Sequence, residues 1–365
     1  MPKNKPVGID QLLSTQDVLA WYNAYPVEPS IAEQVFPIIK SAGKTWKTIS
    51  NSYSGKTEAA DPVSPNSTIP VSGYEGFTDV IGEMAPLAKG YEWTADDIEK
   101  FTKLQADYAQ LKNPIAAAQL IDYYGNNLRK IREAMTSQMA YLDWALVSNA
   151  CQYSFLTANS LYMAGLTAMA YPVSAWQKDA VSTAWSDAAA PILADIQSVL
   201  DTMEDNGRRG LRIFINRTWF KHVRANTQVQ NQTISLVASL VSAKENPNLE
   251  AINAMLLNYF DEDVKFVVVS EKTVRESLDG VKTSASPFQD GVAVFAQGDI
   301  LGHFEHRDLP IINPTLEVYQ DFYVIGNYTK VDPSYAKFYG KGEAFPVIDT
   351  YADNFYLKIN AVVWP

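Results

Sequence analysis

The sequence is poor in cysteine and histidine. It contains one cysteine, Cys151, and three histidines among 365 residues. A single cysteine excludes an intrachain disulfide. Cys151 follows an apolar helical pattern, which indicates a small buried side chain and not a nucleophile. Few cysteine and histidine side chains are therefore available for nucleophilic catalysis or for binding a metal.

Long apolar runs are also missing. No segment approaches the roughly 18 consecutive apolar residues of a membrane-spanning helix. Residues 1–7 are polar and basic, and no apolar stretch follows them, so we expect no secretory signal. We expect a chain that is made and kept in a reducing cytoplasm, away from membranes.

Basic residues are outnumbered by acidic ones. Lys and Arg number 30 and Asp and Glu number 41, giving a formal net charge of −11 and a pI near 4.8. A protein that grips DNA needs a basic surface, because phosphate neutralisation supplies most of its affinity. The balance therefore argues against a dedicated DNA-binding protein. The 47% hydrophobic content suffices for a substantial core in one large domain or two lobes.

Motifs for phosphate binding and serine catalysis are incomplete. The triplets Gly43-Lys44-Thr45 and Gly55-Lys56-Thr57 resemble the end of a phosphate-binding loop. Ile38 and Ser50 stand where such a loop requires its first glycine. No G-x-S-x-G nucleophile motif is present.

His303 and His306 have a spacing compatible with a metal site. Glu305 lies between them, and Asp299 and Asp308 lie nearby. A zinc site needs three or four ligands with supporting contacts, and neither cysteine nor a further histidine is close in sequence. The apolar neighbours favour a structural β-segment instead.

The first 80 residues have the composition of extended surface segments. Five prolines among residues 1–40 forbid a long helix there and favour an arm. Residues 46–77 are polar and small, and they are too many for an ordinary connection. Apolar residues at both ends of this stretch, such as Trp46 and Val71, allow an extended two-stranded hairpin.

The clearest helices follow. Thr94 and Asp97 form a capping-box pattern, and an apolar helical repeat continues from there until Pro114. A second repeat starts near Leu128 and ends near Asn149. It predicts a helix of about 25 residues or more, spanning about 35 Å.

The last part of the chain has a mixed α/β pattern. Pro191 predicts a helix start and Asn206-Gly207 predicts its end. A short helix is predicted at 218–223, and strands are predicted at 211–215, 264–269, 291–295, 322–328 and 355–363.

This order of segments, with several local stretches, resembles a known family. The stretches are Gly82–Lys89 before the helix start at Thr94, Trp185-Ser186-Asp187 leading to Pro191, Leu211–Val229, and Phe345-Pro346-Val347. Together they resemble the major capsid protein of tailed bacteriophages, of the lambda head-protein (capsid protein E) family. Pro86-x-x-Lys89 looks like that family's entry into its spine helix.

The resemblance implies an α+β fold of the Hong Kong 97 phage type. The implied parts are an N-terminal arm (1–45), an extended hairpin loop (46–80), a peripheral domain with a spine helix at about 118–150 (81–160), an axial domain with connecting strands (161–330), and C-terminal return strands of the peripheral domain (331–365).

The same resemblance implies a function in a shell and no catalytic, cofactor or metal site. The chain would form pentamers and hexamers in the icosahedral head of a virion, after assembly in a bacterial cytoplasm. Expected partners are a separate scaffolding protein, a portal and a decoration protein, with weak contact to packaged double-stranded DNA. Implied contacts between copies are Trp46, Lys47, Lys56, Glu83 and Lys89.

Two alternatives remain open at this point. An encapsulin-like compartment would share the fold and would hold cargo enzymes in place of DNA. A cytoplasmic α/β enzyme would instead form a small oligomer with a ligand pocket, and it would be tested first around His303 and His306.

Overall fold

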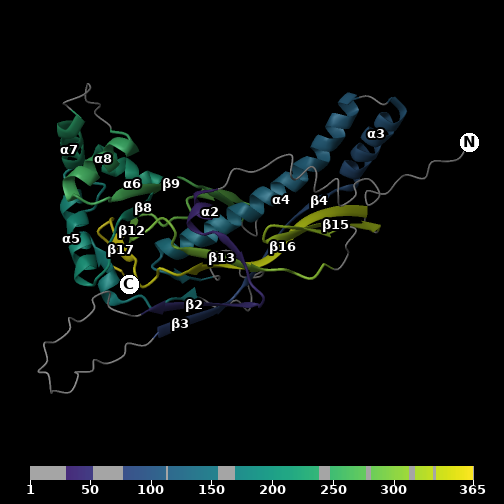
Figure 1. Cartoon of the computed structure of the whole chain (residues 1–365). Coiled ribbons are helices and arrows are strands. Elements are labelled where there is room, and N and C mark those ends of the chain that lie inside the picture. The colour runs from purple at the N-terminus through teal and green to yellow at the C-terminus, as the bar shows by residue number, and fades with distance from the viewer. Residues whose placement is uncertain are drawn as a thin grey trace, which may run out of the picture.

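The structure, a computed structural model, describes residues 30–51, 77–111, 114–154, 169–237, 247–276, 281–311, 317–331 and 334–364. The molecule is elongated. A long helix runs along one face of a long sheet, and a second sheet with its own helices forms a compact group at one end (Figure 1).

One sheet has six strands built around a long central strand, β16 (Ser334–Ile348). The strand order is β1-β13-β16-β15-β14, and β4 also pairs with β16; only β1 pairs in parallel, with β13. The other strands are β1 (Ile38–Lys40), β4 (Ala85–Trp93), β13 (Gly302–Arg307), β14 (Glu317–Gln320) and β15 (Tyr323–Val331).

Two helices cover one face of this sheet. They are α3 (Ala95–Leu111) and the 35-residue α4 (Pro114–Ser148), which at 1.5 Å per residue is about 50 Å long. The face of α4 that bears Ile131 and Met135 is buried against β16, where a Cβ on Gly340 would lie 2.6 Å from Ile131 Cγ2. Glycine at this position therefore allows the helix to approach the strand.

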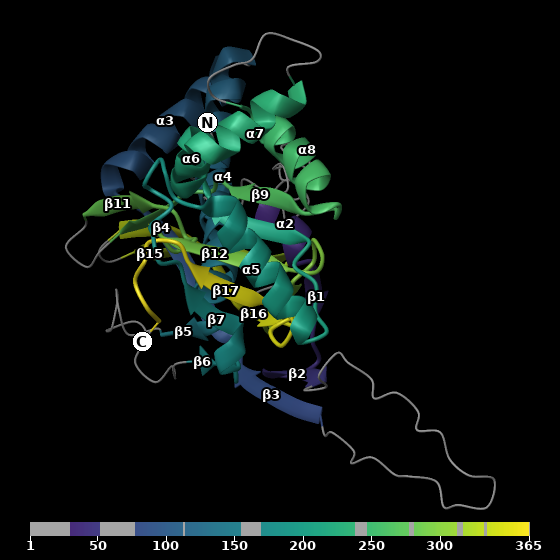
Figure 2. The ribbon, with the colours of Figure 1, turned by 90° about the vertical axis from the view of Figure 1, so that its left-hand side faces the viewer.

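A two-stranded hairpin lies on the opposite face of the sheet. Its strands are β2 (Thr45–Asn51) and β3 (Phe77–Glu83), paired antiparallel with Thr45 opposite Glu83 and Asn51 opposite Phe77. Figures 1 and 2 both place β2 and β3 on the side of the sheet away from α4. We call α3, α4, the six-stranded sheet and this hairpin the elongated half.

The second sheet has five strands in the order β7-β17-β12-β8-β9. One face is covered by helices and the other faces the end of α4; we call this sheet and its helices the compact half. Its strands are β7 (Lys178–Ala180), β8 (Arg212–Asn216), β9 (Lys265–Val269), β12 (Val292–Ala296) and β17 (Phe355–Lys358), and its helices are α5 (Ile192–Asp205), α6 (Arg217–Ala225), α7 (Thr227–Val237) and α8 (Leu249–Phe260).

Alternation along β8 divides the hydrophobic core. Ile213 and Ile215 belong to the cluster under the helices of the compact half, whereas Phe214 belongs to the cluster around α4. The rings of Phe214 and Trp144 lie 5.9 Å apart, centroid to centroid. The two halves therefore meet through packed aromatic side chains.

Short elements complete the described part of the chain. They are α2 (Ile31–Val35), the 3₁₀ helix η3 (Ala175–Gln177), the strand pair β5 (Gln152–Tyr153) and β6 (Met169–Ala170), and the hairpin β10 (Thr273–Glu276) with β11 (Lys282–Ala285). Within the described ranges, none of the helices combines the length and the apolar run that a membrane crossing requires.

Several predicted elements are confirmed. The backbone N–H of Thr94 donates to Asp97 Oδ2 (3.1 Å), the N–H of Asp97 donates to Thr94 Oγ1 (3.4 Å), and the helix ends before Pro114. The long helix ends at Ser148, one residue before the predicted end. Gly207 follows α5 with a φ of 70°, as a helix C-cap requires.

Three predictions were wrong, one about the entry into the spine helix and two about the last strand. Pro86-x-x-Lys89 lies inside β4 and does not enter the spine helix; α3 separates it from α4. The last strand ends at Lys358 and not at 363, because the chain turns at Ala361, whose φ is 58°. This strand, β17, pairs with β12 and β7 in the five-stranded sheet and does not return to the elongated half.

Candidate assembly surface

Trp46 fixes the base of the β2–β3 hairpin. Its indole lies between the rings of Tyr171 and Phe345, with centroid distances of 5.8 Å and interplanar angles of 16° and 6°. The side chain is 1% exposed. The structure thus places Trp46 in the core of this chain, where it anchors the hairpin to β16 and does not present its side chain to a neighbouring molecule.

Gly82 stands opposite Trp46 in the hairpin. A Cβ at this position would lie 2.2 Å from Met169 Cε and 2.4 Å from Trp46 Cζ2. Any other residue would displace the indole or the methionine. We call the packing of Trp46 against Gly82, Met169, Tyr171 and Phe345 the seat of the hairpin, and this seat depends on the glycine.

Lys47 lies on the outer face of the hairpin, since successive side chains of a strand alternate between faces. Its ammonium is 2.7 Å from the carboxylate of Asp79, and both side chains are about half exposed. Ile81 pairs with Lys47 in the register and is 62% exposed. The outer face therefore combines an exposed apolar side chain with an ion pair, which is the composition of a surface that another protein can cover.

The other three implied contact residues are dispersed. Glu83 is exposed at the base of the hairpin, opposite Thr45. Lys89 lies on β4 beside Gly340 of β16, with its ammonium 5.7 Å from the ring centroid of Tyr91. Lys56 lies outside the described residues. The structure thus gathers Trp46, Lys47 and Glu83 on one hairpin and places Lys89 on the neighbouring sheet.

The two histidines with metal-compatible spacing do not meet. Along β13, His303 and Glu305 point to the hairpin side of the sheet, and His306 is buried on the α4 side, where burial lowers its pKa. Across the residues that the structure describes, no group of three or more Cys, His, Asp and Glu side chains is arranged to hold a metal ion. The strand geometry removes the basis for the metal interpretation.

His303 instead joins the turn after β16 to the hairpin. Its Nδ1 is 2.8 Å from Asp349 Oδ2, and Asp349 Oδ1 accepts a hydrogen bond from the Thr48 hydroxyl at 2.8 Å. The hydrogen bond with Asp349 raises the pKa of His303 above its usual 6.5, and the charges of Asp349 and Glu305 act in the same direction. Sequence reasoning missed this contact, because Thr48 and Asp349 are 301 residues apart.

Carboxyl groups also meet under α2. The carboxylate of Glu271 accepts hydrogen bonds from the Ala32 N–H (3.2 Å) and from the Trp144 indole N–H. Asp143 on α4 is fully buried, and neither of its carboxyl oxygens has a hydrogen-bond partner. Burial, together with the charges of Glu271 and Glu33, raises the pKa of Asp143 well above its usual 3.8. Burial of this kind favours the protonated, neutral form of the Asp143 carboxyl over its charged form.

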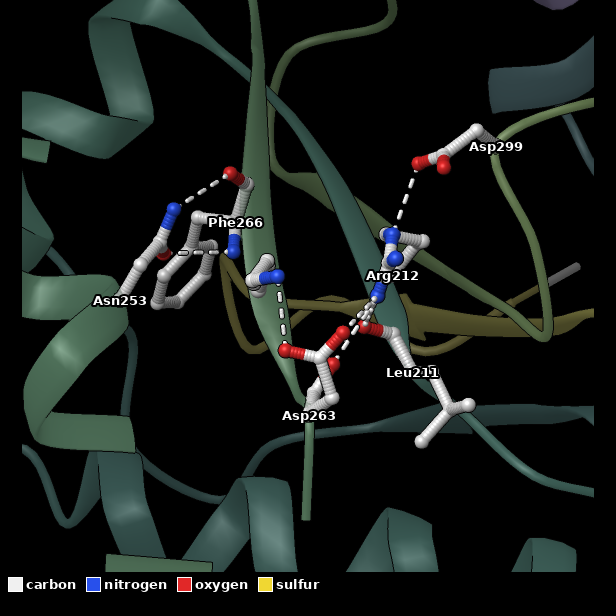
Figure 3. A network of polar contacts seen from close by, with 7 residues as sticks. Leu211, Arg212, Asn253, Asp263, Phe266 and Asp299 are labelled. Carbon is white, nitrogen blue, oxygen red and sulfur yellow. Dashed lines mark hydrogen bonds and ion pairs between the residues drawn. The ribbon is translucent and has the colours of Figure 1, made fainter. Parts of the chain in front are cut away.

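Side chains complete the β9 edge of the five-stranded sheet and join its last two strands, β17 and β7. At β9, the amide of Asn253 accepts from the Phe266 N–H (2.9 Å) and donates to the Phe266 carbonyl (3.2 Å), as a neighbouring strand would (Figure 3). At the other end of the strand order, the indole N–H of Trp364 lies 3.1 Å from both the Asp179 carbonyl of β7 and the Tyr356 carbonyl of β17, so it bridges these two strands. The contacts of Asn253 oppose the addition of a further strand at β9.

Arg212 holds the neighbouring loops at the start of β8. Its guanidinium contacts the Asp299 carboxylate at 2.7 Å, the Asp263 carboxylate at 3.5 Å and the Asp263 carbonyl at 2.9 Å (Figure 3). A single arginine thus ties together the chain before β9 and the turn after β12, which stiffens this end of the compact half.

The open hollow between α8 and β9 gives no support to an enzyme. Its volume is about 600 Å³, and its lining is Asn248, Leu249, Glu250, Asn253, Ala254, Leu257 and Lys265. This lining supplies one carboxylate and one ammonium, without a nucleophile or a histidine. Such a set lacks the paired base and nucleophile that covalent catalysis needs.

Comparisons with known proteins identify the fold. No protein-family model matches the sequence, and no curated protein matches it. A crystal structure of a phage-related protein from Bordetella bronchiseptica RB50 is similar at 12% identity and a TM-score of 0.55, covering 96% of this chain and 98% of that chain. A protein of an Escherichia coli CFT073 prophage, assigned as its capsid protein, is similar at 13% identity and a TM-score of 0.57, covering 95% and 99%.

Each of these two similarities covers nearly the whole of this chain and of the other protein, so it identifies the fold of the whole chain. The chain has the α+β fold of tailed-phage capsid proteins, the Hong Kong 97 type, and the predicted fold class is confirmed.

Proposed function

We propose that this chain is the major capsid protein of a tailed phage or of a closely related particle. Its function is structural: copies assemble into the icosahedral shell that encloses double-stranded DNA, as part of the virion. The finer assignment, to the lambda head-protein family, rests on the sequence stretches that resemble it.

The observation that carries this proposal is the β2–β3 hairpin. It is rooted by Trp46 and Gly82 inside the elongated half, and its outer face presents Ile81, 62% exposed, beside the Lys47–Asp79 ion pair. A neighbouring copy could bury this isoleucine together with the ion pair beside it, as partners do at protein interfaces. The fold it shares with phage proteins supports the same function.

In this proposal the parts of the chain have distinct roles. Residues 1–45 form the arm, 46–80 the extended loop, 81–160 the peripheral domain and 161–330 the axial domain with its connecting strands. From 331 the chain returns through β16 to the peripheral domain, and β17 then belongs to the axial sheet. The compact half would surround the axis of each pentamer and hexamer, and a separate scaffolding protein, a portal and a decoration protein would be its partners.

Electron microscopy of the purified chain tests the proposal. The chain should be imaged concentrated alone and again with a candidate scaffolding protein encoded beside it. Rings, tubes or closed shells are the expected result. A uniform small oligomer under every condition would overturn it. Particles from the native source should hold nuclease-protected DNA; protein cargo in its place would favour the encapsulin-like compartment.

A further inference from the structure

We infer that His303 and Asp349 form a proton-controlled clamp, which fixes the base of the β2–β3 hairpin against the six-stranded sheet and loosens it when His303 loses its charge. The clamp concerns the single chain. Its effect on assembly rests on the proposed function.

The clamp lies where three segments converge. Asp349 is in the turn after β16, His303 is on β13 and Thr48 is on β2. One carboxylate serves both partners: Oδ1 accepts from the Thr48 hydroxyl and Oδ2 contacts His303 Nδ1, each at 2.8 Å. Thr48 is 4% exposed, so water has little access to replace this contact. A change at His303 is therefore passed to the hairpin through a single shared group.

Only the charged imidazole satisfies both of its neighbours. Nδ1 contacts Asp349, and Nε2 lies 3.6 Å from the Glu305 carboxylate. An imidazolium has an N–H on each ring nitrogen, whereas a neutral ring with its proton on Nδ1 turns the lone pair of Nε2 toward Glu305. Loss of the proton therefore removes the attraction of the cation for both carboxylates and leaves only the Nδ1–H donor to Asp349.

The remaining charged groups near His303 are already paired with each other. On the same face of the sheet, Arg307 is bound to Glu343 of β16. From the hairpin, Thr48 and Trp46 face the sheet, and the Lys47–Asp79 pair lies on the outer face. His306 points to the opposite face. The charge balance at the clamp is thus set by His303, Asp349 and Glu305.

The sign of the pH dependence follows from the raised pKa of His303. The folded state binds this proton more tightly than the unfolded chain does, so the stabilisation added by the His303 charge is complete below pH 6.5 and is lost as the pH rises through the raised pKa. The Trp46 seat does not titrate and remains. Raising the pH should therefore loosen the hairpin without detaching it.

Histidine NMR and a distance measurement together test the clamp on the unassembled chain. Because the chain has three histidines, the His303 signal can be assigned by comparison with His303→Gln. Its midpoint should lie above 6.5 and should fall in Asp349→Asn. Spin labels at Ile81→Cys and Ile300→Cys, both on exposed sites, should give a narrow distance distribution at pH 6 that broadens by pH 9.

Variants separate the clamp from general destabilisation. His303→Gln should give the broad distribution at both pH values. Thr48→Val keeps the shape of the side chain and removes the hydroxyl donor; it should uncouple the hairpin and leave the His303 midpoint raised. His222→Gln, on α6 in the compact half, should behave as the wild type.

Two results would overturn the inference: an unchanged distance distribution in the wild type between pH 6 and 9, or a distribution in His303→Gln that stays narrow at both values. Both are independent of shell formation. A responsive clamp in a chain that never assembles would contradict the proposed function alone, and shells without a pH response would contradict the clamp alone.

Discussion

The two sheets differ in how their margins are completed. In the five-stranded sheet, Asn253 supplies the hydrogen bonds that another strand would make to β9, and Trp364 bridges the carbonyls of β7 and β17. The elongated half instead extends a hairpin from its sheet, with Ile81 exposed on the outer face. One sheet has its β9 edge completed by a side chain of the same chain, and the other half extends a ribbon whose outer face is open to another molecule.

This difference suits two separate roles, one for the compact half and one for the hairpin. A half with its β9 edge covered can meet identical neighbours through side chains and loops without fusing that edge to theirs. A hairpin anchored by Trp46 and Gly82 can reach a neighbour while its base stays fixed. In the proposed shell, rings of five and of six made from one chain would need such a combination, because rigid bodies keep their shape while extended segments absorb the difference in curvature.

The largest expected effect comes from separating the two halves. Phe214→Ala removes a fully buried ring that packs against Trp144 at their junction and should cost about 3–5 kcal/mol. It should also split thermal unfolding into two transitions in calorimetry. Phe295→Ala, equally buried but under the helices of the compact half, should cost a similar amount and melt that half first. Identical single transitions in both variants would show that the halves are one unit.

A smaller effect is expected from the hairpin seat. Gly82→Ala places a Cβ against Met169 and Trp46, and overpacking of this kind costs about 1–3 kcal/mol. Hydrogen exchange should accelerate in β2 and β3 and stay unchanged in the compact half. Gly298→Ala is the control, because a Cβ on Gly298 would meet no other atom within 4 Å. Faster exchange throughout the chain would contradict a seat that acts locally.

The effect of Asp143→Asn on the free energy of unfolding depends on whether the Asp143 carboxyl of the wild type is protonated. Because the folded-state pKa of Asp143 is raised, the stability that depends on its proton is complete below the unfolded value of 3.8 and is lost as the pH rises through the folded pKa. Asp143→Asn should therefore be more stable than the wild type at pH 8, and the gap should close toward pH 4, by at most about 1.4 kcal/mol per pH unit. Denaturant titrations at several pH values measure this gap. Glu133→Gln, exposed on the same helix, should show no such trend.

The smallest effect is expected at the covered edge of β9. Asn253→Ala removes two hydrogen bonds to Phe266 and should cost about 1–2 kcal/mol. It should also let chains associate through the exposed strand, which sedimentation velocity would detect as irregular oligomers. Asn258→Ala, further along α8, should leave the edge covered. A monodisperse Asn253→Ala chain would contradict the assigned function of this amide.

The helices of the elongated half could be predicted, because their limits are set by residues close in sequence. Its sheet could not, because its strands pair with segments far away in the chain. Thr94, Asp97 and Pro114 mark helix limits through contacts within a few residues. In β16, Gly340 and Gly342 gave the sequence a turn-like composition, although they are needed where Ile131 and Tyr323 approach the strand. No local pattern indicates such an approach.

The candidate surface was predictable in position and less so in its chemistry. The polar stretch indicated a hairpin, and β2 with β3 confirms its base. Trp46 was predicted as an outward contact because an aromatic residue suits both a core and an interface, and only the positions of Tyr171 and Phe345 decide between them. The link between His303 and Asp349 depends on the register of β13 with β16, which one sequence does not reveal.

The most direct test of the account compares the wild-type chain with Ile81→Asp by electron microscopy. Ile81 is 62% exposed in its own chain, so the variant should keep the wild-type circular dichroism spectrum and lose little in melting temperature. The wild type should form rings, tubes or shells, and Ile81→Val should do the same. Ile81→Asp should stay unassembled. Shells of Ile81→Asp that equal those of the wild type in number and shape would contradict the assignment of this hairpin as the contact between copies.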